Sequence, residues 1–427
     1  MIEEWKATPA KLAQEELVML APLEEELQHA AARCREALGD PEFAGLDILV
    51  PNAPRSGAGW FELLSKYDKD PNGTATLKGM RRALPAGLAN AGVTIERYIV
   101  LQALTHAALS MESRRLPVTV KRLFAALCSE VAAKERQWDT HFDMEGDQER
   151  FLDMAELATL RRFSVGTLNF AYERLALLFP TLHVHPLSLP GYIYQRVVAM
   201  PFTKPTIGPH LSYGRKGSLT LRQRDFERSL WLIAKTVEMN PKVTGINGWS
   251  WFNSQIVGEV YPHLAWIRNV LAEGGAYLID TYPAEPGGYG FGYNNRKRQI
   301  LYEQGKFCPR QTAYFWPRDD FLEWASRHPE LVPEGETPVQ APQHHAQLRV
   351  RSPKPTKHTK HNSSITLWSG MAVLARIGKL KYATLVLMLP ALSLSLVVLL
   401  MSNVWIAIPT FPIWVFLAFS FQYFVAQ

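Results

Sequence analysis

Apolar residues recur at helical spacing through the first 180 residues of the chain. Leu20, Leu23 and Leu27 lie on one face of a helix that Thr8-Pro9 opens and that ends near Gly39. The same periodicity predicts a helix beginning near Thr94 and three more, at about Pro117–Glu135, Glu149–Arg162 and Thr167–Leu178. Residues 1–180 are therefore predicted to form a helical region.

After Pro180 the pattern changes to short β-branched and aromatic runs between helical segments. The expected strands are Tyr192–Met200, Lys242–Phe252, Ala276–Asp280 and Thr312–Trp316. The expected helices are Leu221–Met239, Ile256–Ala272 and Asn294–Gln304. Strands that alternate with helices predict a mixed α/β domain at 181–332.

The last part of the sequence has a different composition again. Residues 333–381 are rich in Pro, His, Thr and Lys and read as a basic flexible linker and juxtamembrane segment. Residues 382–427 contain no Asp, Glu, Lys or Arg. The run Tyr382–Met401 is long enough for a bilayer core of about 30 Å, and a second apolar run, Val404–Ala426, follows it. We expect transmembrane segments here, as one span or as a helical hairpin. The expected fold class is α+β or α/β, with a C-terminal transmembrane helical hairpin.

Charge gives this expected tail an orientation. Eight Lys and Arg residues and no acidic residue lie in 337–381, and subtracting those eight from the net charge of +6 leaves −2 for residues 1–336. Basic residues next to a span stay on the cytoplasmic side, which predicts a C-terminally anchored protein with most of the chain in the cytoplasm. The start, MIEEWKATPA, does not resemble a secretory signal. The same basic segment favours anionic lipid headgroups as a partner, and the near-neutral remainder argues against nucleic acid.

Candidate metal motifs are weak. Cys34, Cys128 and Cys308 are too far apart to suggest a Cys-based metal site or a disulfide framework. His141-x-Asp143 with His183, His185 or His210 has the ligand types of a non-haem iron oxygenase, but its surroundings are predicted to be helical. We expect no bound metal and keep the oxygenase as the weakest alternative.

The block Pro241–Pro317 contains the pair Asn294 and Asn295, then Leu301-Tyr302-Glu303, Gly305 and Phe307. This order resembles the closing segment of the GCN5-related N-acetyltransferase (GNAT) superfamily. In that superfamily an Asn precedes a helix, a Leu-Tyr-Glu-x-Gly-Phe-like turn and a final strand. Asn294 or Asn295 matches the Asn of that pattern. The resemblance covers about residues 240–318.

The resemblance implies transfer of an acyl group from acyl-coenzyme A to an amine. It assigns Tyr302 as the general acid for the leaving thiolate, and Glu259, or alternatively Glu238, as the residue that takes the amine proton. Asn294, Asn295, Trp249 and Ser250 are the expected cofactor-binding residues. A splayed strand would offer backbone N–H groups to the thioester carbonyl.

One departure from the superfamily pattern keeps a second hypothesis open. A Gly-containing loop that binds the coenzyme pyrophosphate is expected before a helix, yet Asn253-Ser254-Gln255 follow the strand at 243–252. The alternative is a non-catalytic, membrane-anchored interaction protein whose protein partner the sequence does not identify.

Overall fold

The structure is a computed structural model of the 427-residue chain. It describes residues 14–44, 92–133, 148–174, 189–195, 199–201, 204–211, 222–284 and 295–342. The chain divides into two compact units, Met1–His345 and Ala346–Gln427, and all described residues belong to the first. The elements and contacts described below therefore all lie in the first unit.

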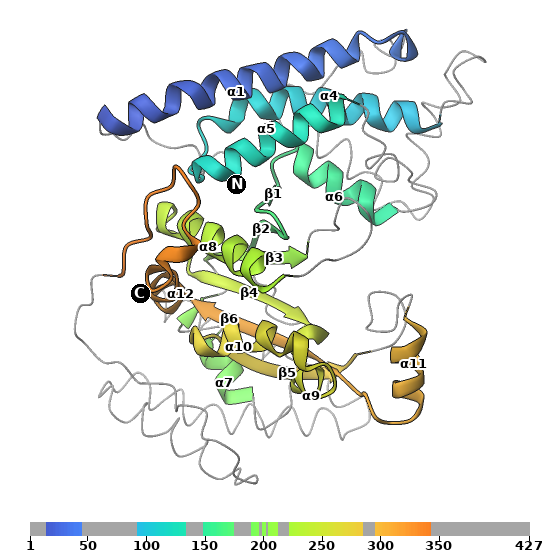
Figure 1. The fold of residues 1–427 in the computed structure, drawn as a ribbon, viewed down its shortest axis with the longest axis vertical. Helices are drawn as coiled ribbons and strands as arrows, with labels where there is room; N and C mark the ends of the chain where they lie inside the picture. The colour runs from blue at the N-terminus through green and yellow to red at the C-terminus, as the bar shows by residue number, and fades with distance from the viewer. Residues whose placement is uncertain are drawn as a thin grey trace, which may run out of the picture. The chain divides into compact units, whose positions relative to one another are not determined.

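Helices dominate the described residues before the sheet. They are α1 (Gln14–Leu38), the short 3-10 helix η2 (Pro41–Phe43), α4 (Gly92–Met111), α5 (Val118–Ala132) and α6 (Gln148–Ala158). Figure 1 shows α1 lying beside α4 and α5, which is consistent with their shared apolar core.

Within the described residues, six strands form one sheet in the order β1-β2-β3-β4-β6-β5. The strands are β1 (Arg162–Ser164), β2 (Leu168–Arg174), β3 (Pro205–Leu211), β4 (Gly245–Ser250), β5 (Tyr277–Pro283) and β6 (Arg310–Pro317). The helices between and after them are α7 (Leu189–Tyr194), α8 (Gln223–Met239), α9 (Gln255–Val260), α10 (Ala265–Glu273), α11 (Arg296–Glu303) and α12 (Arg318–Ser326). Three more 3-10 turns are η8 (Trp251–Asn253), η9 (Pro262–Leu264) and η10 (Pro329–Leu331).

The middle of the sheet contains its parallel pair of strands. β3 and β4 run parallel and share a single ladder pair, Ile207 with Ile246. Their outer neighbours hold them far more extensively, because β2 pairs with all seven residues of β3 and β6 pairs with all six of β4, both antiparallel. Each inner strand is thus fixed from outside, and the two separate from each other beyond Ile207 and Ile246.

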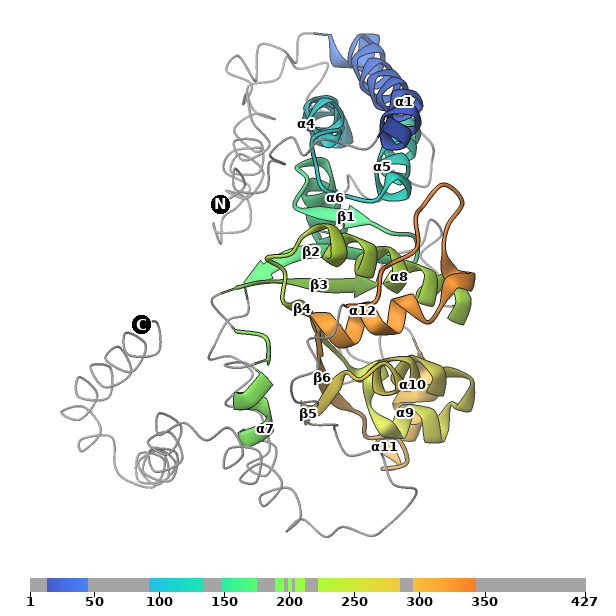
Figure 2. The ribbon, with the colours of Figure 1, turned by 90° about the vertical axis from the view of Figure 1, so that its left-hand side faces the viewer.

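The strand register sorts side chains onto two faces of different character. Successive residues of a strand alternate between faces, and paired residues share a face. Phe170, Ile207, Ile246 and Trp316 fall on one face, which we call the helix-covered face. Figure 2 shows α8, α10 and α12 on this side of the sheet and α7 on the other.

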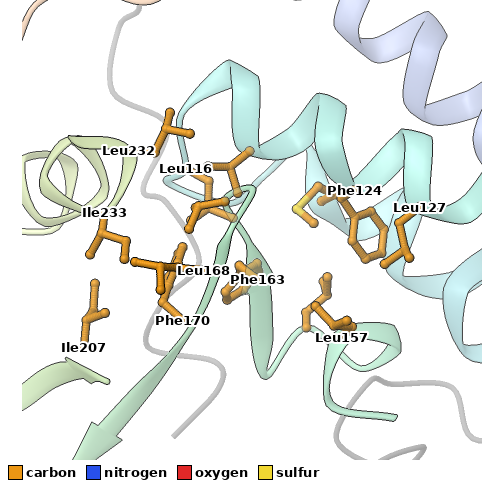
Figure 3. Packing of buried hydrophobic residues seen from close by; sticks show 14 of the residues in the cluster. Leu116, Phe124, Leu127, Leu157, Phe163, Leu168, Phe170, Ile207, Leu232 and Ile233 are labelled. Carbon is orange, nitrogen blue, oxygen red and sulfur yellow. The ribbon is translucent and has the colours of Figure 1, made fainter. Parts of the chain in front are cut away.

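The apolar core runs from the N-terminal helices onto the helix-covered face. Figure 3 shows Phe124 and Leu127 of α5 near Phe163 of β1, and Ile207 of β3 beneath Ile233 of α8. Each large apolar side chain buried in this way contributes about 1.5–3 kcal/mol relative to exposure. The helices and the sheet therefore share one continuous core.

Trp316 and Arg318 connect β6 to the helices that cover it. Trp316 is fully buried, its ring packs on Phe321 and Trp324 of α12, and its indole Nε1 donates to the Gly274 carbonyl at 2.8 Å. The Arg318 guanidinium donates to backbone carbonyls at the end of α8, including that of Asn240. A cation at this position satisfies carbonyls that a helix end leaves unpaired.

The structure confirms most of the predicted helices and some of the strands. The predictions beginning near Thr94 and at 117–135, 221–239 and 294–304 correspond to α4, α5, α8 and α11, and the first predicted helix corresponds to α1. The predicted strands at 242–252, 276–280 and 312–316 correspond to β4, β5 and β6. The described residues thus form helices and a mixed sheet, as the fold class required.

Other predictions are wrong. The helix expected at 167–178 is strand β2 as far as Arg174, because Leu168, Phe170 and Tyr172 alternate onto the apolar face. The helix expected at 149–162 is present as α6, but it ends at Ala158 and β1 begins at Arg162, so the expected extent of the helical region is wrong because the sheet starts inside it. The strand expected at 192–200 contains the end of α7 instead.

A further prediction is correct only in part. The helix expected at 256–272 is split into α9 and α10, because Pro262 cannot donate the backbone hydrogen bond that would continue it.

The predicted tail, 382–427, lies outside the described residues, as do residues 343–381 of the linker. Among the helices that the structure describes, none is at once long and apolar enough to cross a bilayer.

We expect Trp316→Ala to lower the free energy of unfolding by about 3–5 kcal/mol, because it removes a buried ring and leaves a cavity under α12. Trp249→Ala is the matched control, because Trp249 is 60% exposed and should change stability by less than about 1 kcal/mol. Urea unfolding of full-length protein in detergent measures both, and similar losses for the two variants would contradict the assigned core.

Candidate functional site

The opening between β3 and β4 is the most unusual backbone feature of the described sheet. The ladder stops after Ile207 and Ile246, so Gly208–Leu211 and Asn247–Ser250 run on without a ladder between them. Backbone groups in the centre of a sheet are normally paired, and those that are not remain available to bind a ligand. The opening lies at the carboxyl ends of two parallel strands, where open α/β sheets commonly bind ligands.

Two glycines let side chains from the outer strands lie over β3 and β4. A Cβ placed on Gly208 of β3 would lie 2.3 Å from the Glu173 carboxyl carbon, so the Glu173 side chain crosses β3 at this glycine. A Cβ on Gly248 of β4 would lie 2.8 Å from the Tyr314 hydroxyl, which therefore sits over β4. Glu173 comes from β2 and Tyr314 from β6, and the register places them on opposite faces of the sheet, Tyr314 on the helix-covered face with Trp316.

Tyr314 is held in its protonated form. Burial raises the pKa of its hydroxyl, and the nearby negative charge of Glu173 raises that pKa further. The hydroxyl therefore retains its proton at neutral pH, over β4 on the helix-covered face.

Glu173 forms a hydrogen bond with His210 on the face opposite α8. The Glu173 Oε1 and His210 Nε2 atoms are 3.1 Å apart, and both side chains are between one third and one half exposed. Register places Glu173 and His210 on one face with Gly208 and Asn247, and we call this the open face. A carboxylate that orients an imidazole is a common arrangement for accepting a proton.

An acidic group from α6 and β1 adjoins this pair. Arg162 forms ion pairs with Asp153 and with Glu156, the latter at 2.6 Å. Burial raises the pKa of Asp153, whereas the charges of Arg162 and His210 act to lower it. Among the described residues, this region thus holds the carboxylates of Asp153, Glu156 and Glu173 and the guanidiniums of Arg162 and Arg161, which leaves an excess of negative charge beside the open face.

Two buried amide oxygens on the open face have no donor among the residues that the structure describes. They are Asn169 Oδ1 on β2, beside His210 in the ladder, and Asn247 Oδ1 on β4, one residue after Ile246. A buried acceptor without a donor costs about 1–3 kcal/mol. Both oxygens are suited to a ligand that brings N–H or O–H donors.

Trp249 lies on the same face at the carboxyl end of β4. It is exposed to 60%, an unusual exposure for a tryptophan in the middle of a sheet. Trp249 and His210 are each three residues beyond the Ile207–Ile246 pair, so their side chains leave the two strands on the same face, on opposite sides of the opening.

The predicted general acid, Tyr302, lies elsewhere. It is half-buried at the end of α11, in a separate apolar cluster that contains Trp251 and Phe307. Trp251 directly follows β4, so this cluster adjoins the carboxyl end of that strand. Gly305 has a φ of +67°, which explains why glycine follows α11 in the motif.

Asn294 lies outside the described residues. The other predicted residues make the following contacts. Glu259 is exposed on α9 and accepts from Gln255 Nε2 at 3.0 Å, and Glu238 forms an ion pair with Lys235 at 2.5 Å. Asn295 caps α11 by accepting from the Arg298 N–H. Ser250 caps η8 by accepting from the Phe252 N–H. Of the predicted residues, Trp249 and Ser250 are the two on the strand that borders the opening.

The sequence does not point to Glu173 or Tyr314, and it offers His210 only as a possible metal ligand. They come from β2, β3 and β6, which lie far apart in the sequence and meet only through the strand order. The available signal was the pair of glycines inside strands, at 208 and 248, because glycine in a strand often marks a close approach.

Metal chemistry receives no support from the part of the chain that the structure describes, where no group of three or more His, Cys, Asp or Glu side chains is arranged to hold an ion. His141, Asp143, His183 and His185 of the oxygenase hypothesis lie outside that part.

No protein-family model, no curated protein and no solved structure matches the chain.

The geometry predicts unequal effects of adding a methyl group at the two glycines. Gly248→Ala should lower the free energy of unfolding by about 1–3 kcal/mol, because it meets the buried ring of Tyr314. Gly208→Ala should cost less, although its clash is closer, because the half-exposed Glu173 carboxylate can turn towards water. Chemical denaturation of the two variants checks this order, and a larger loss for Gly208→Ala would mean that Glu173 is the more rigidly held group.

Proposed function

We propose that this protein transfers an acyl group from acyl-coenzyme A to an amine. The observation that carries the proposal is the parallel pair β3 and β4, which separates after one ladder pair in an otherwise antiparallel sheet. The superfamily that residues 240–318 resemble uses a splayed strand to present backbone N–H groups to a thioester carbonyl. The opening supplies such groups on strands that β2 and β6 hold in place.

The chemistry requires a proton donor and a proton acceptor near the opening. The amine nitrogen attacks the thioester carbon, the C–S bond breaks, the thiolate takes a proton, and the amine loses one. Tyr314 is one candidate donor, because its protonated hydroxyl lies over β4, and it would reach a thiolate only from the helix-covered face. Tyr302 is the donor that the sequence motif implies, and the two tyrosines are alternatives that mutation can separate.

Coenzyme binding also requires a site for phosphates. The stretch after β4, where the superfamily pattern places a glycine loop, forms η8 and then α9. The helix that follows β3 is α8, which begins at Gln223. The sequence before it contains Gly214, Arg215, Lys216 and Gly217, residue types that bind pyrophosphate at a helix N-terminus. These four residues lie outside the described part of the chain.

We further propose that residues 382–427 anchor the protein in a membrane, as one span or a hairpin, with the bulk of the chain on the cytoplasmic side. The support is the absence of charged residues from this segment and the eight basic residues before it. An enzyme held this way would act at the membrane surface, next to anionic headgroups.

Acyl transfer predicts that acetyl- or longer acyl-coenzyme A raises the melting temperature of the full-length protein and that an amine then releases free thiol. Tyr314→Phe should reduce the transfer rate by about 10–100-fold with the melting temperature nearly unchanged, if Tyr314 is the donor. Tyr302→Phe is the matched variant. If only this variant loses transfer activity, Tyr302 of the sequence motif is the proton donor and Tyr314 is not. No thermal shift and no thiol release with any chain length would instead favour the non-catalytic interaction protein.

Membrane anchoring predicts that the full-length protein sediments with membranes and resists extraction by high salt. A variant ending at His345, the last residue of the first compact unit, should remain in the supernatant. Full-length protein that stays in the supernatant without detergent would contradict the anchor.

A further inference from the structure

We propose that the open face of the sheet binds the acceptor as a primary alkylammonium ion, between Trp249 and the Glu173–His210 pair. An acceptor that binds as an ammonium ion is an aliphatic amine, because aliphatic amines are charged at neutral pH. Arylamines and alcohols are uncharged at that pH and are excluded. The role of this site in acyl transfer rests on the proposed function, whereas the binding of an ammonium ion does not.

The first observation is the polarity of the groups around the opening. The Glu173 carboxylate and the side-chain oxygens of Asn169 and Asn247 are all acceptors on one face. An ammonium group has three N–H donors and no acceptor, so it complements this set. A carboxylate or phosphate ligand would be repelled by the same oxygens, because it also presents acceptor atoms with negative charge.

The second observation is charge. The described side chains of this region include the carboxylates of Asp153, Glu156 and Glu173, against the guanidinium of Arg162 and that of Arg161, which interacts with Glu156. Arg162 is already paired with two of these carboxylates, and the Glu173 carboxylate bonds only to the His210 imidazole among the residues that the structure describes, so with that ring neutral the charge of Glu173 faces the open face. A negative face of this kind attracts cations from solution.

The third observation is the exposed ring of Trp249. Tryptophan is the side chain that binds a cation best through its ring face. Trp249 leaves β4 three residues after the last ladder pair, level with His210 on β3. A cation on the open face between these strands therefore meets a ring on one side and a carboxylate–imidazole pair on the other.

The arrangement also suggests how the bound ammonium becomes a nucleophile. His210 in its neutral form takes one proton from the ammonium, and Glu173 stabilises the resulting imidazolium. The free amine then attacks the thioester carbon at the opening. As the C–S bond breaks, the nitrogen loses its second proton and the departing thiolate gains one from the tyrosine donor or from water, while His210 passes its proton to water. Each proton and electron pair is accounted for without a further reactant.

Isothermal titration of full-length protein in detergent, without any acyl-coenzyme A, tests the binding. The probes are butylammonium, tetramethylammonium, which keeps the charge but has no N–H donor, and butanol, which has no charge. We expect millimolar or tighter binding of butylammonium, weaker binding of tetramethylammonium and none of butanol. Trp249→Leu and Glu173→Gln should each weaken butylammonium binding by about tenfold.

Matched controls keep the test specific. Ile300→Ala removes another exposed apolar side chain, and Glu273→Gln removes another exposed carboxylate, and neither should change the affinity. Near-ultraviolet circular dichroism shows whether each variant is folded, and Trp249→Leu is expected to fold because its ring is exposed. No butylammonium binding to the unaltered protein, or equal losses in the controls, would overturn the proposal.

The two proposals fail in different ways. If butylammonium binds and depends on Trp249 and Glu173 while acyl-coenzyme A gives no thermal shift, the ammonium site stands and acyl transfer does not. If acyl-coenzyme A binds and is turned over but Trp249→Leu and Glu173→Gln leave the Michaelis constant for a butylamine acceptor unchanged, acyl transfer stands and this acceptor site is wrong.

Discussion

Two parallel strands that share one ladder pair create a constraint on which the rest of the site depends. A sheet tends to close such a gap, since each missing backbone bond in its interior has a cost. Here β3 is held by seven residue pairs with β2, and β4 by six pairs with β6. Closing the gap would require one of these longer ladders to shift. The opening is therefore fixed by its neighbours.

The two faces of the sheet give the opening different surroundings. On the helix-covered face, Ile207, Ile246 and Trp316 pack under α8 and α12 in a continuous core. On the open face, Glu173, His210 and the unpaired oxygen of Asn247 lie near the same strands. Apolar packing on one side supports the strands while the other side remains polar. This division allows an opening with polar surroundings to exist in a stable sheet.

The sequence was informative where local pattern decides structure. The helices α4, α5 and α8 and the strands β4 and β6 follow their periodicity, because each has one clear apolar face or a buried run. The segment at 167–178 was misread, since Leu168, Phe170 and Tyr172 fit a helix and a strand almost equally over so short a span. Strand β3 is not predicted from the sequence, because Pro205, Gly208 and Pro209 are residue types typical of turns.

The site was less predictable than the fold. Trp249 and Ser250 were named as candidates because they stand on a recognisable strand, and Tyr302 because of a short motif. Glu173 and Tyr314 gave no local signal, since their significance arises only when β2 and β6 flank the parallel pair. The pairing of strands distant in sequence is set by the whole core, which no window of residues contains.

Hydrogen–deuterium exchange of the full-length protein, with and without an acyl-coenzyme A, tests most directly whether the opening is the ligand site. The account predicts slower amide exchange after Ile207 in β3 and after Ile246 in β4, with β1 and β5 unchanged. Exchange that slows only at α11 around Tyr302, or nowhere in the sheet, would contradict it.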